Sequence, residues 1–419
     1  MNVCVFEDQG YEAFYPLTTA RPVYDLLLGT SRILDKVTQF FSREVVILHC
    51  RDFLKPILKQ TYKGMTVNQI NSGSNCLFIN GRAVLTKPLF DIFTRMEDGH
   101  DYLFTYRGTC VGMYLGGELL TLMKDLLISI PTSQELIHHF RSKCISKELD
   151  DAVVMEHVWD LVKTNTDIIE TDTSLNNQLG IFKGDIRPYT SIYNENDVYI
   201  GPGTHIDDFV VLDARLGPIY IDEQVKIDSH TTIEGPTFIG NHSRILGGKI
   251  CASSVGPYCK VSGELSHSVM TKYSNKAHAG FIGHSYIGDW VNLGAGTTNS
   301  NLKNTYGTVQ LEMNNRRIPT NQIFLGSIIG DHVKMGIGTL LNTGTSVGCG
   351  ANIFGSELHS KYISPFSWGS ANNYMPYKKE KFIQTTQRMM ARRNITLSHD
   401  SQQVLELIYD HETKNRTRA

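Results

Sequence analysis

No block of lysine or arginine occurs in this sequence, and neither sign of charge is in marked excess. The 40 basic and 42 acidic residues give a formal net charge of −2 and a pI near 6.7. Proteins that bind nucleic acid or membrane surfaces carry clustered positive charge, which attracts phosphate groups. The composition therefore argues against both partners, and small molecules are the expected ligands.

Paired cysteines and long apolar runs are also missing. The eight cysteines are scattered and form no Cys-x-x-Cys pair, which is typical of a reducing compartment. No apolar run approaches the roughly 20 residues that cross a bilayer, and the first residues lack the basic and apolar regions of a secretion signal. We therefore expect a soluble, cytoplasmic protein.

What the sequence does contain is a six-residue repeat. The aliphatic ladders are Ile323, Ile329, Met335, Leu341, Val347 and Ile353; Ile221, Ile227, Ile233, Ile239 and Ile245; Ile200, Ile206 and Leu212; and Phe281, Ile287 and Leu293. Six is neither a helix nor a hairpin period. It is typical of a left-handed parallel β-helix (hexapeptide repeat), in which six residues form one strand and one corner and three such pieces complete a coil. Each ladder residue should point inward and stack on its counterpart one coil away.

The ladders occupy only part of the 419 residues, so another domain should precede them. Strand-like patterns at 3–5, 44–48 and 76–80 alternate with helix-like segments at 33–41 and 55–62. This alternation favours an open, mostly parallel α/β sheet of the nucleotidyltransferase-like, Rossmann-like kind, whose ligands bind outside the carboxyl ends of the strands. We expect an α/β domain at 1–165, a linker at 166–185, the β-helix at 186–360 and a helical tail at 361–419.

One stretch of the β-helix is unusually polar. It consists of Asn275-Lys276-Ala277-His278-Ala279-Gly280-Phe281, Asn292-Leu293-Gly294-Ala295-Gly296-Thr297 and Asn299-Ser300-Asn301-Leu302-Lys303-Asn304. These motifs resemble the acetyltransferase domain of the bifunctional N-acetylglucosamine-1-phosphate uridylyltransferase/glucosamine-1-phosphate N-acetyltransferase family, and most closely its divergent bacterial branch. The resemblance covers most of residues 190–395.

The resemblance implies roles for five residues. His278 corresponds to the general base that takes a proton from the sugar amine as the amine attacks acetyl-CoA; an imidazole, which ordinarily titrates near pH ~6.5, suits this step. Asn301 corresponds to the substrate-binding Asn of the catalytic site, and Ala295 to a residue whose backbone faces the acetyl group. Arg244 corresponds to the residue that holds the sugar phosphate, because a guanidinium fork fits phosphate geometry. Phe281 lies where the family usually has Tyr, so a substrate-binding hydroxyl is missing.

Structural interpretations stand beside these roles. Asn and Gly tolerate the left-handed backbone of corners, so Ala295 could serve corner geometry alone, and Arg244 could lie on a solvated face. His278 and His284 raise the question of a zinc site. Residues six apart occupy different faces of the prism and no third His completes a ligand set, so we expect no metal there.

The α/β half carries part of a nucleotide-binding signature. Sugar-nucleotide transferases place a Gly-rich loop containing an Arg after the first strand, then Pro-Leu-Thr and a basic residue before Pro, and these groups hold the triphosphate. Residues 14–22, Phe-Tyr-Pro-Leu-Thr-Thr-Ala-Arg-Pro, are similar to the second half. The similarity implies that Arg21 binds phosphate, with a structural salt bridge as the alternative.

The first half of that signature is poorly matched. Residues 8–13 keep one glycine and have Ala13 near the position of the loop Arg. Asn80 ends a predicted strand where a metal-binding Asp is usual, and an amide is a weaker Mg²⁺ ligand than a carboxylate. Lys36 and Asp25 are weaker candidates for the nucleotide site.

Three functions fit these patterns. The first is a bifunctional transferase that makes UDP-N-acetylglucosamine from a sugar phosphate, acetyl-CoA and UTP, with Mg²⁺ for the nucleotidyl step, as a homotrimer whose sites lie between neighbouring prisms. The second is a sugar-1-phosphate nucleotidyltransferase for another sugar, with the β-helix as a trimerisation scaffold. The third is a sensor whose α/β half binds sugar nucleotides without turnover. The sequence identifies neither the sugar phosphate nor the nucleoside triphosphate.

Overall fold

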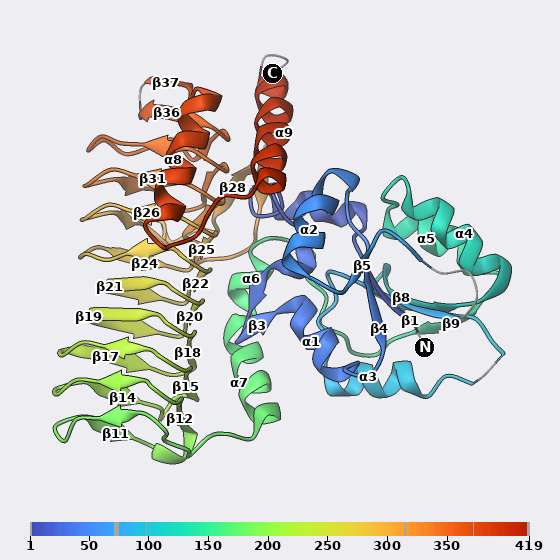
Figure 1. Cartoon of the computed structure of the whole chain (residues 1–419), viewed down its shortest axis with the longest axis horizontal. Helices are drawn as coiled ribbons and strands as arrows, with labels where there is room; N and C mark the ends of the chain where they lie inside the picture. Colours follow the sequence, from blue (N-terminus) through green and yellow to red (C-terminus); the bar gives the residue numbers. More distant parts are fainter. Residues whose placement is uncertain (1, 71–74, 98, 314–315, 372, 417–419) are drawn as a thin grey trace.

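The computed structural model describes residues 2–70, 75–97, 99–313, 316–371 and 373–416. An α/β domain and a β-helix lie side by side, with α7 (Asn165–Asn176) along their boundary and α9 (His399–Arg416) near the carboxyl-terminal end of the prism (Figure 1). The predicted fold class is confirmed. Among the helices of the described residues, none is both long enough and apolar enough to cross a membrane.

A seven-stranded mixed sheet forms the centre of the α/β domain, in the order β5-β4-β1-β6-β8-β7-β9. β1 pairs in parallel with β4 and β6, whereas β8 is antiparallel to both of its neighbours. The strands are β1 (Asn2–Phe6), β4 (Val45–Leu48), β5 (Thr66–Val67), β6 (Cys76–Asn80), β7 (Tyr102–Tyr106), β8 (Thr109–Leu115) and β9 (Ile145–Glu148). The three strands predicted from the sequence are therefore confirmed as β1, β4 and β6.

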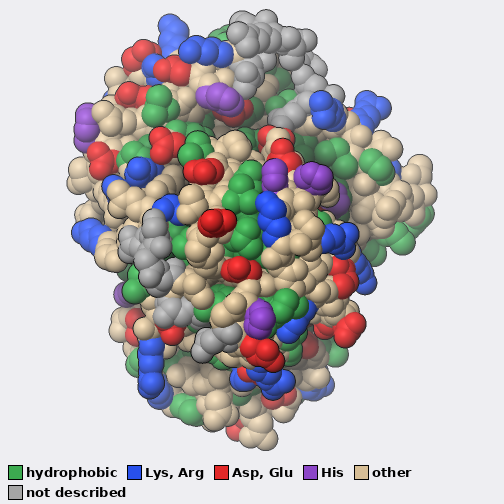
Figure 2. Space-filling model, turned by 90° about the vertical axis from the view of Figure 1, so that its right-hand side faces the viewer, with side chains coloured by type: hydrophobic (Ala, Val, Ile, Leu, Met, Phe, Trp, Pro, Cys, Tyr) green, Lys and Arg blue, Asp and Glu red, His purple; other side chains and the backbone are tan. Residues whose placement is uncertain are grey.

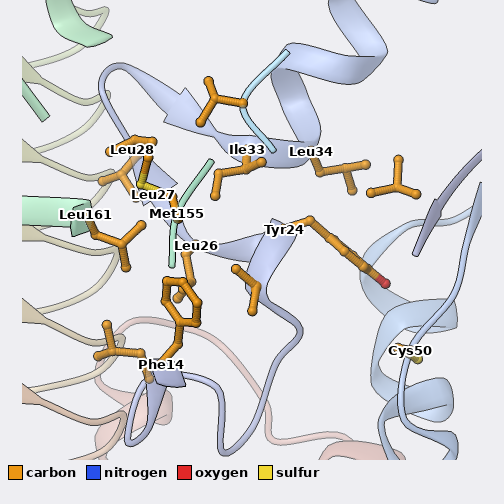
Figure 3. Close-up of a cluster of buried hydrophobic side chains, with 14 of the residues drawn as sticks. Phe14, Tyr24, Leu26, Leu27, Leu28, Ile33, Leu34, Cys50, Met155 and Leu161 are labelled. Carbon is orange, nitrogen blue, oxygen red and sulfur yellow. The ribbon is translucent and has the colours of Figure 1, made fainter. Parts of the chain in front are cut away.

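Both faces of the central strands of this sheet are buried. Val3 and Val5 of β1 pack into one hydrophobic cluster and Cys4 and Phe6 into another, because successive side chains of a strand point to opposite faces. Figure 3 shows part of the first, larger cluster. The helices are α1 (Ile33–Phe40), α2 (Lys55–Thr61), α3 (Lys87–Thr94), α4 (Gly117–Leu127), α5 (Ser133–Phe140) and α6 (Asp160–Lys163), and a small hairpin joins β2 (Leu27–Leu28) to β3 (Ser31–Arg32).

Short parallel strands stack in coils to form the β-helix (Figure 1). The first strands are β10 (Asp185–Ile186), β11 (Ser191–Tyr193), β12 (Val198–Ile200), β13 (His205–Ile206), β14 (Val211–Asp213), β15 (Ile219–Ile221), β16 (Lys226–Ile227), β17 (Thr231–Glu234), β18 (Thr237–Ile239), β19 (Arg244–Cys251), β20 (Ser254–Val255), β21 (Lys260–Ser266) and β22 (Val269–Met270). The later ones are β23 (Asn275–Lys276), β24 (Phe281–Gly283), β25 (Tyr286–Ile287), β26 (Asn292–Leu293), β27 (Thr298–Asn299), β30 (Ser327–Ile329), β31 (Lys334–Met335), β32 (Leu340–Leu341), β33 (Thr345–Val347), β34 (Asn352–Ile353), β35 (Tyr362–Ile363) and β36 (Ser367–Ser370). Ile206, Ile227 and Ile245 are Cα partners in successive coils and are fully buried, as the ladders predict.

The structure corrects two ladder positions. Ile323 is 51% exposed, because residues 300–326 leave the prism between β27 and β30 and contain the hairpin of β28 (Gln310–Met313) and β29 (Arg316–Pro319). Ile282, which is the Cα partner of Leu265, points inward in place of Phe281. The prediction failed at these positions because the repeat is interrupted by an insertion and is not strictly six residues long at every side of a coil.

The carboxyl-terminal segment returns to the α/β domain. After β36 pairs with β37 (Asn373–Pro376), α8 (Lys379–Ala391) and α9 follow. Val404, Leu405 and Ile408 of α9 belong to the same hydrophobic cluster as Leu54 and Leu58 of the α/β domain. The two parts of the chain thus share one core.

Candidate functional site

The predicted base, His278, lies at an exposed corner of the β-helix, in the turn between β23 and β24. Ala295 occupies the same corner one coil later, because β23 and β26 are paired in register. A backbone hydrogen bond of 2.9 Å from the Gly296 N–H to the Ala279 carbonyl joins the two turns. The structure therefore brings His278 and Ala295 together on the outer surface.

Asn301 and Phe281 meet on the adjoining face of the prism. A Cβ placed on Gly283 would lie 2.8 Å from the Asn301 amide nitrogen and 2.4 Å from the Phe281 ring, so both side chains cover this glycine. The Phe281 N–H donates to the hydroxyl of Thr298 at 3.3 Å. Two further predicted residues are thus gathered beside the His278 corner.

Asn301 is oriented by a histidine. Its Nδ2 donates to Nδ1 of His284 at 2.9 Å, and the His284 ring stacks between His267 and Phe324, with centroid distances of 4.7 and 5.1 Å. Burial, together with the neighbouring His267, lowers the pKa of His284 to about 4. The ring is therefore neutral at physiological pH, and its Nδ1 can accept the amide proton. Sequence reasoning had considered His284 only as a metal ligand.

Two polar side chains take inward positions that aliphatic residues fill elsewhere. Lys276 is 2% exposed and Asn299 1%. Asn299 accepts from the Gly283 N–H at 2.9 Å and donates to Ser285 Oγ at 3.2 Å. Sequence reasoning missed both residues, although a step of six back from Ile282 identifies Lys276 as an inward lysine.

Arg244 lies on a different outer face, in a row of cations. Lys226, Arg244 and Lys260 are Cα partners in successive coils, and the row continues to Asn275, whose Oδ1 accepts from Arg393 Nη2 at 2.7 Å. Burial and the charges of neighbouring arginines lower the pKa of Lys260. Arg244 is half-exposed, 3.9 Å from Asp228, and stands two coils before the coil of His278. It is therefore not in contact with the other predicted site residues.

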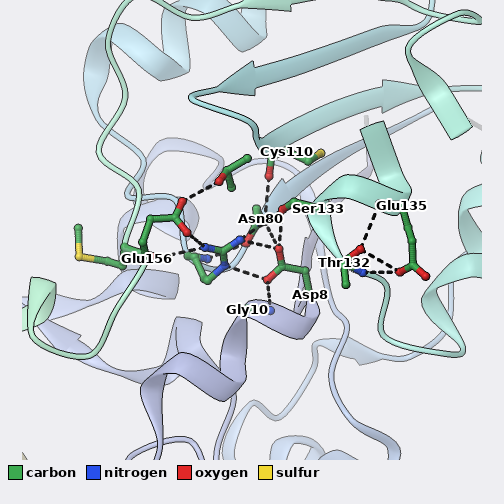
Figure 4. A network of polar contacts seen from close by, with 11 residues as sticks. Asp8, Gly10, Asn80, Cys110, Thr132, Ser133, Glu135 and Glu156 are labelled. Atoms are coloured by element: carbon green, nitrogen blue, oxygen red, sulfur yellow. Dashed lines mark hydrogen bonds and ion pairs between the residues drawn. The ribbon is translucent and has the colours of Figure 1, made fainter. Parts of the chain in front are cut away.

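A network of largely buried polar and charged side chains lies at the carboxyl ends of β1 and β6 (Figure 4). The Arg82 guanidinium donates to both carboxylate oxygens of Asp8, at 2.8 and 2.7 Å, and to Glu156 at 2.7 Å. Asn80 donates to Asp8 at 3.0 Å and accepts from the Arg82 N–H at 3.0 Å. Because Asp8 and Asn80 are both engaged with Arg82, this donor set does not fit a Mg²⁺ ion, which requires free oxygen ligands.

A second buried pair lies beside the first. Arg51 donates to both carboxylate oxygens of Glu7, at 3.0 and 3.1 Å, and to the carbonyls of Thr18 and Arg21. The segment that corresponds to the poorly matched Gly-rich loop forms the 3-10 helix η1 (Gln9–Phe14). Arg51 and Arg82 are the cations of these two buried pairs. Sequence reasoning missed both, since they lie far along the chain from the signature at 14–22.

Arg21 forms the structural salt bridge that was the alternative to phosphate binding. Its Nη2 lies 2.6 Å from Asp331 and 2.8 Å from Asp289, both in the β-helix. The weaker candidates are similarly engaged. Lys36 Nζ donates to Asp172 at 2.6 Å, and Asp25 is bonded to Tyr62 and Arg32.

The electrostatic surface matches small-molecule ligands. On the face shown in Figure 2, the coloured basic and acidic side chains are interspersed, with no broad area of one sign. Within the described ranges, no group of three or more His, Cys, Asp or Glu gathers closely enough to hold a metal ion.

Comparison with known proteins confirms the resemblance in the α/β half. Residues 3–178 match the model of a sugar nucleotidyl transferase family. The expected domain bound of 165 stays a prediction, and the match extends over α7.

Curated relatives carry both predicted halves in their names. The chain is 34% identical over 91 residues to a bifunctional sugar-1-phosphate nucleotidylyltransferase/acetyltransferase from Sulfurisphaera tokodaii, covering 22% of this chain and 23% of that protein. It is 30% identical over 170 residues to the bifunctional protein GlmU of Methanococcus vannielii, covering 41% and 33%, and 29% identical over 234 residues to that of Methanococcus aeolicus, covering 55% and 48%. The chain thus spans less than half the length of these relatives.

Among solved structures, a UDP-N-acetylglucosamine acyltransferase matches with 16% identity and a TM-score of 0.25, covering 48% of this chain and 75% of that one. The Arabidopsis UDP-N-acetylglucosamine acyltransferase matches with 12% identity and a TM-score of 0.19, covering 50% and 80%. These scores are too low to carry an argument about function.

Proposed function

We propose that this chain, which resembles the bifunctional sugar-phosphate transferases, is itself one. On the β-helix it would acetylate the amine of glucosamine 1-phosphate from acetyl-CoA, and on the α/β domain it would transfer uridylyl from UTP to give UDP-N-acetylglucosamine. The observation that carries the acetyl-transfer proposal is the exposed corner of His278, with Ala295 one coil later and Asn301 on the adjoining face.

The acetyl transfer needs a base for the proton of the amine and groups that bind the sugar and the acetyl group. His278 takes a proton from the sugar amine while the nitrogen forms a bond to the thioester carbonyl carbon, and the proton then passes to the sulfur as the carbon–sulfur bond breaks and CoA leaves. Asn301, whose Nδ2 is fixed by neutral His284, keeps its Oδ1 for a donor on the sugar. Backbone groups of the Ala295 turn would contact the acetyl group. Phe281 offers an apolar surface in place of a hydroxyl.

Arg244 is proposed to hold the sugar phosphate. The support is its position in the row with Lys226 and Lys260, where three cations share the single nearby carboxylate of Asp228, since an excess of positive charge attracts phosphate. Because Arg244 lies two coils before the coil of His278, Lys249 is a second candidate for holding the sugar phosphate. Lys249 lies in the same outward row as Glu264 and Phe281.

A homotrimer is proposed as the working form. Leu340 is the Cα partner of Thr298 and is bridged to Leu358, and these two leucines are 39% and 57% exposed. Ile337, one coil beyond Ala295 at the same corner, is 78% exposed. Exposed apolar side chains that border a site are typical of a surface covered by a partner, and a neighbouring prism would complete the site.

A cytoplasmic location is proposed as well. All eight cysteines are free thiols, which supports a reducing compartment.

A second candidate function is favoured by the two buried ion pairs at the carboxyl ends of the strands of the α/β domain. The Asp8–Arg82 and Glu7–Arg51 pairs occupy the place where a triphosphate would bind, and Asn80 is no carboxylate. In this alternative the α/β half binds a nucleotide or sugar nucleotide without turnover.

One experiment separates these functions. The purified full chain is incubated with glucosamine 1-phosphate and acetyl-CoA, and free CoA is measured with a thiol reagent; in a separate assay it is given N-acetylglucosamine 1-phosphate, UTP and Mg²⁺, and pyrophosphate is measured. We expect CoA release that falls by about 10²-fold or more in His278→Ala, with pyrophosphate release unchanged. CoA release that His278→Ala leaves intact, or no release from an assembled oligomer, would contradict the acetyl-transfer proposal. UTP binding without pyrophosphate would support the sensor.

A further inference from the structure

Lys276 occupies the interior of the β-helix directly beneath the His278 turn. It follows Ile245 and Val261 in one inward row, as their Cα partner in successive coils. Its side chain is 2% exposed. A lysine at this point interrupts a column of aliphatic residues, and no such residue is needed for the repeat itself.

The ammonium is held by carbonyl groups of two coils. Nζ donates to the carbonyls of Ser262 and Gly280, each at 2.6 Å, and to the carbonyl of His278 at 3.2 Å. The neighbouring coil leaves room for it with Gly263, where a Cβ would lie 2.7 Å from Nζ. Gly263 has a φ of +76°, so both the space and the backbone conformation require glycine here.

A charge in this position is costly unless it performs a task. No ion pair joins Lys276 to a carboxylate within the described residues, and burial lowers the pKa of its ammonium to about 8, against a smaller opposing effect of Glu264. A methionine of similar length would avoid the desolvation of the charge. What the lysine supplies instead is a set of donors for three carbonyls that converge on one point and that would otherwise repel one another.

Two of those carbonyls belong to the turn that carries the proposed base. We propose that Lys276 is a positioning residue for His278: its ammonium fixes the backbone of residues 278–280, and so the direction of the imidazole toward Ala295. This inference rests on the proposed acetyl transfer. A misplacement of about 1 Å in a catalytic group can cost about 10²-fold in rate, so the rigidity of this turn matters to the chemistry.

The test compares Lys276→Met with a control in the same inward row. Ile245→Ala leaves a cavity two coils from Lys276 and serves as the matched structural variant. At a temperature where both variants are folded, we expect Lys276→Met to lower kcat of CoA release by about 10²-fold with both KM values within about two-fold of the native ones. Ile245→Ala should leave kcat within about two-fold. Lys276→Gln, which keeps two N–H donors, should recover part of kcat.

A second measurement does not depend on activity. Hydrogen–deuterium exchange followed by mass spectrometry should show a peptide that covers residues 276–284 exchanging at least about ten-fold faster in Lys276→Met than in the native chain, because local opening of the turn becomes easier. Peptides from the coils of β13 and β16 should be unchanged. Equal exchange in the two proteins, or an equal loss of kcat in Ile245→Ala, would overturn the proposal. If the native chain releases no CoA, the proposed function fails, and the exchange result alone decides whether Lys276 holds the turn.

Discussion

Nη2 of Arg21 lies 2.6 Å from the carboxylate of Asp331, across the boundary between the α/β domain and the β-helix. The same nitrogen lies 2.8 Å from Asp289. Burial would lower the pKa of Arg21, but the charges of the two aspartates raise it well above the ordinary value. The signature residue of a nucleotide loop therefore serves as the electrostatic link between the two halves of the chain.

Removal of this link should destabilise the whole chain. Arg21→Met leaves the buried carboxylate of Asp331 without a counter-charge and leaves Asp289 only Lys272, at 3.6 Å, and we expect a loss of about 3–5 kcal/mol in the free energy of unfolding, measured by urea denaturation. Arg215→Met is the matched control, because Arg215 pairs with Asp213 at the surface and such a pair contributes about 0–1 kcal/mol. Equal losses in the two variants would show that the buried ion pairs of Arg21 stabilise the fold no more than the exposed pair of Arg215 does.

Asn301 should matter for acetyl transfer through its amide. Asn301→Ala removes the proposed contact to the sugar and leaves the part-buried His284 Nδ1 without its donor, so CoA release should fall by about 10²-fold. The control is Asn304→Ala, an exposed residue of the same insertion, which should be neutral. An Asn301→Ala enzyme with native kcat/KM would remove Asn301 from the site.

The site of the sugar phosphate can be decided between two cations. Arg244 and Lys249 lie near opposite ends of β19 on different faces of the prism, and they form ion pairs with Asp228 and Glu234, respectively. The variant that removes the phosphate ligand should raise KM for glucosamine 1-phosphate by about ten-fold with little change in kcat, which is the mark of lost ground-state binding. Steady-state kinetics of Arg244→Ala and Lys249→Ala would assign the role, and unchanged KM in Arg244→Ala would withdraw it from Arg244.

UTP binding should depend little on Mg²⁺ if Asp8 and Asn80 stay bonded to Arg82. Asn80 and Asp8 are both bonded to Arg82, so addition of EDTA should change the UTP-induced rise in melting temperature by less than about 1 °C, since only ligands bound by the folded state stabilise it. A large loss of the shift with EDTA would show that Asp8 leaves Arg82 to bind metal.

The stability of the chain should rise between about pH 8 and pH 10 because of Lys276. Burial lowers the pKa of Lys276 to about 8, and that of Lys334 to about 7, so in this range the unfolded chain binds more protons than the folded one. The contribution of Lys276 to the free energy of unfolding is lost as the pH falls through its folded-state pKa of about 8. In Lys276→Met the rise in urea midpoint should be smaller than in the native chain. Equal slopes would show that the ammonium is well solvated.

The sequence predicted the β-helix well because inward stacking imposes a strict period, which Ile206, Ile227 and Ile245 display without interruption. It failed at Ile323 and Phe281, where an insertion and a shortened side break the count. Contiguous sequence motifs contain His278, Ala295 and Asn301. The closeness of these three residues on the β-helix could therefore be predicted.

The remaining part of the site depends on long-range partners. Arg82 reaches Asp8 across 74 residues and Arg21 reaches Asp331 across 310, and no local pattern encodes such pairings. A cation with phosphate-binding chemistry and one with a structural partner have the same appearance in a sequence. The ion pairs of Arg21 with Asp289 and Asp331 are therefore visible only in the packing of the two halves, and phosphate binding by Arg21 stays a prediction.

The return of α9 to the α/β domain has a practical consequence. Ser398 and Ser401 donate to Gln60 of α2 at 2.8 and 3.0 Å, while apolar residues of α9 complete the core around Leu54 and Leu58. Expression of the amino-terminal half by itself would uncover this surface and invite aggregation, so the smallest fragment worth crystallising is the entire polypeptide. Calorimetry of that polypeptide should record one melting peak.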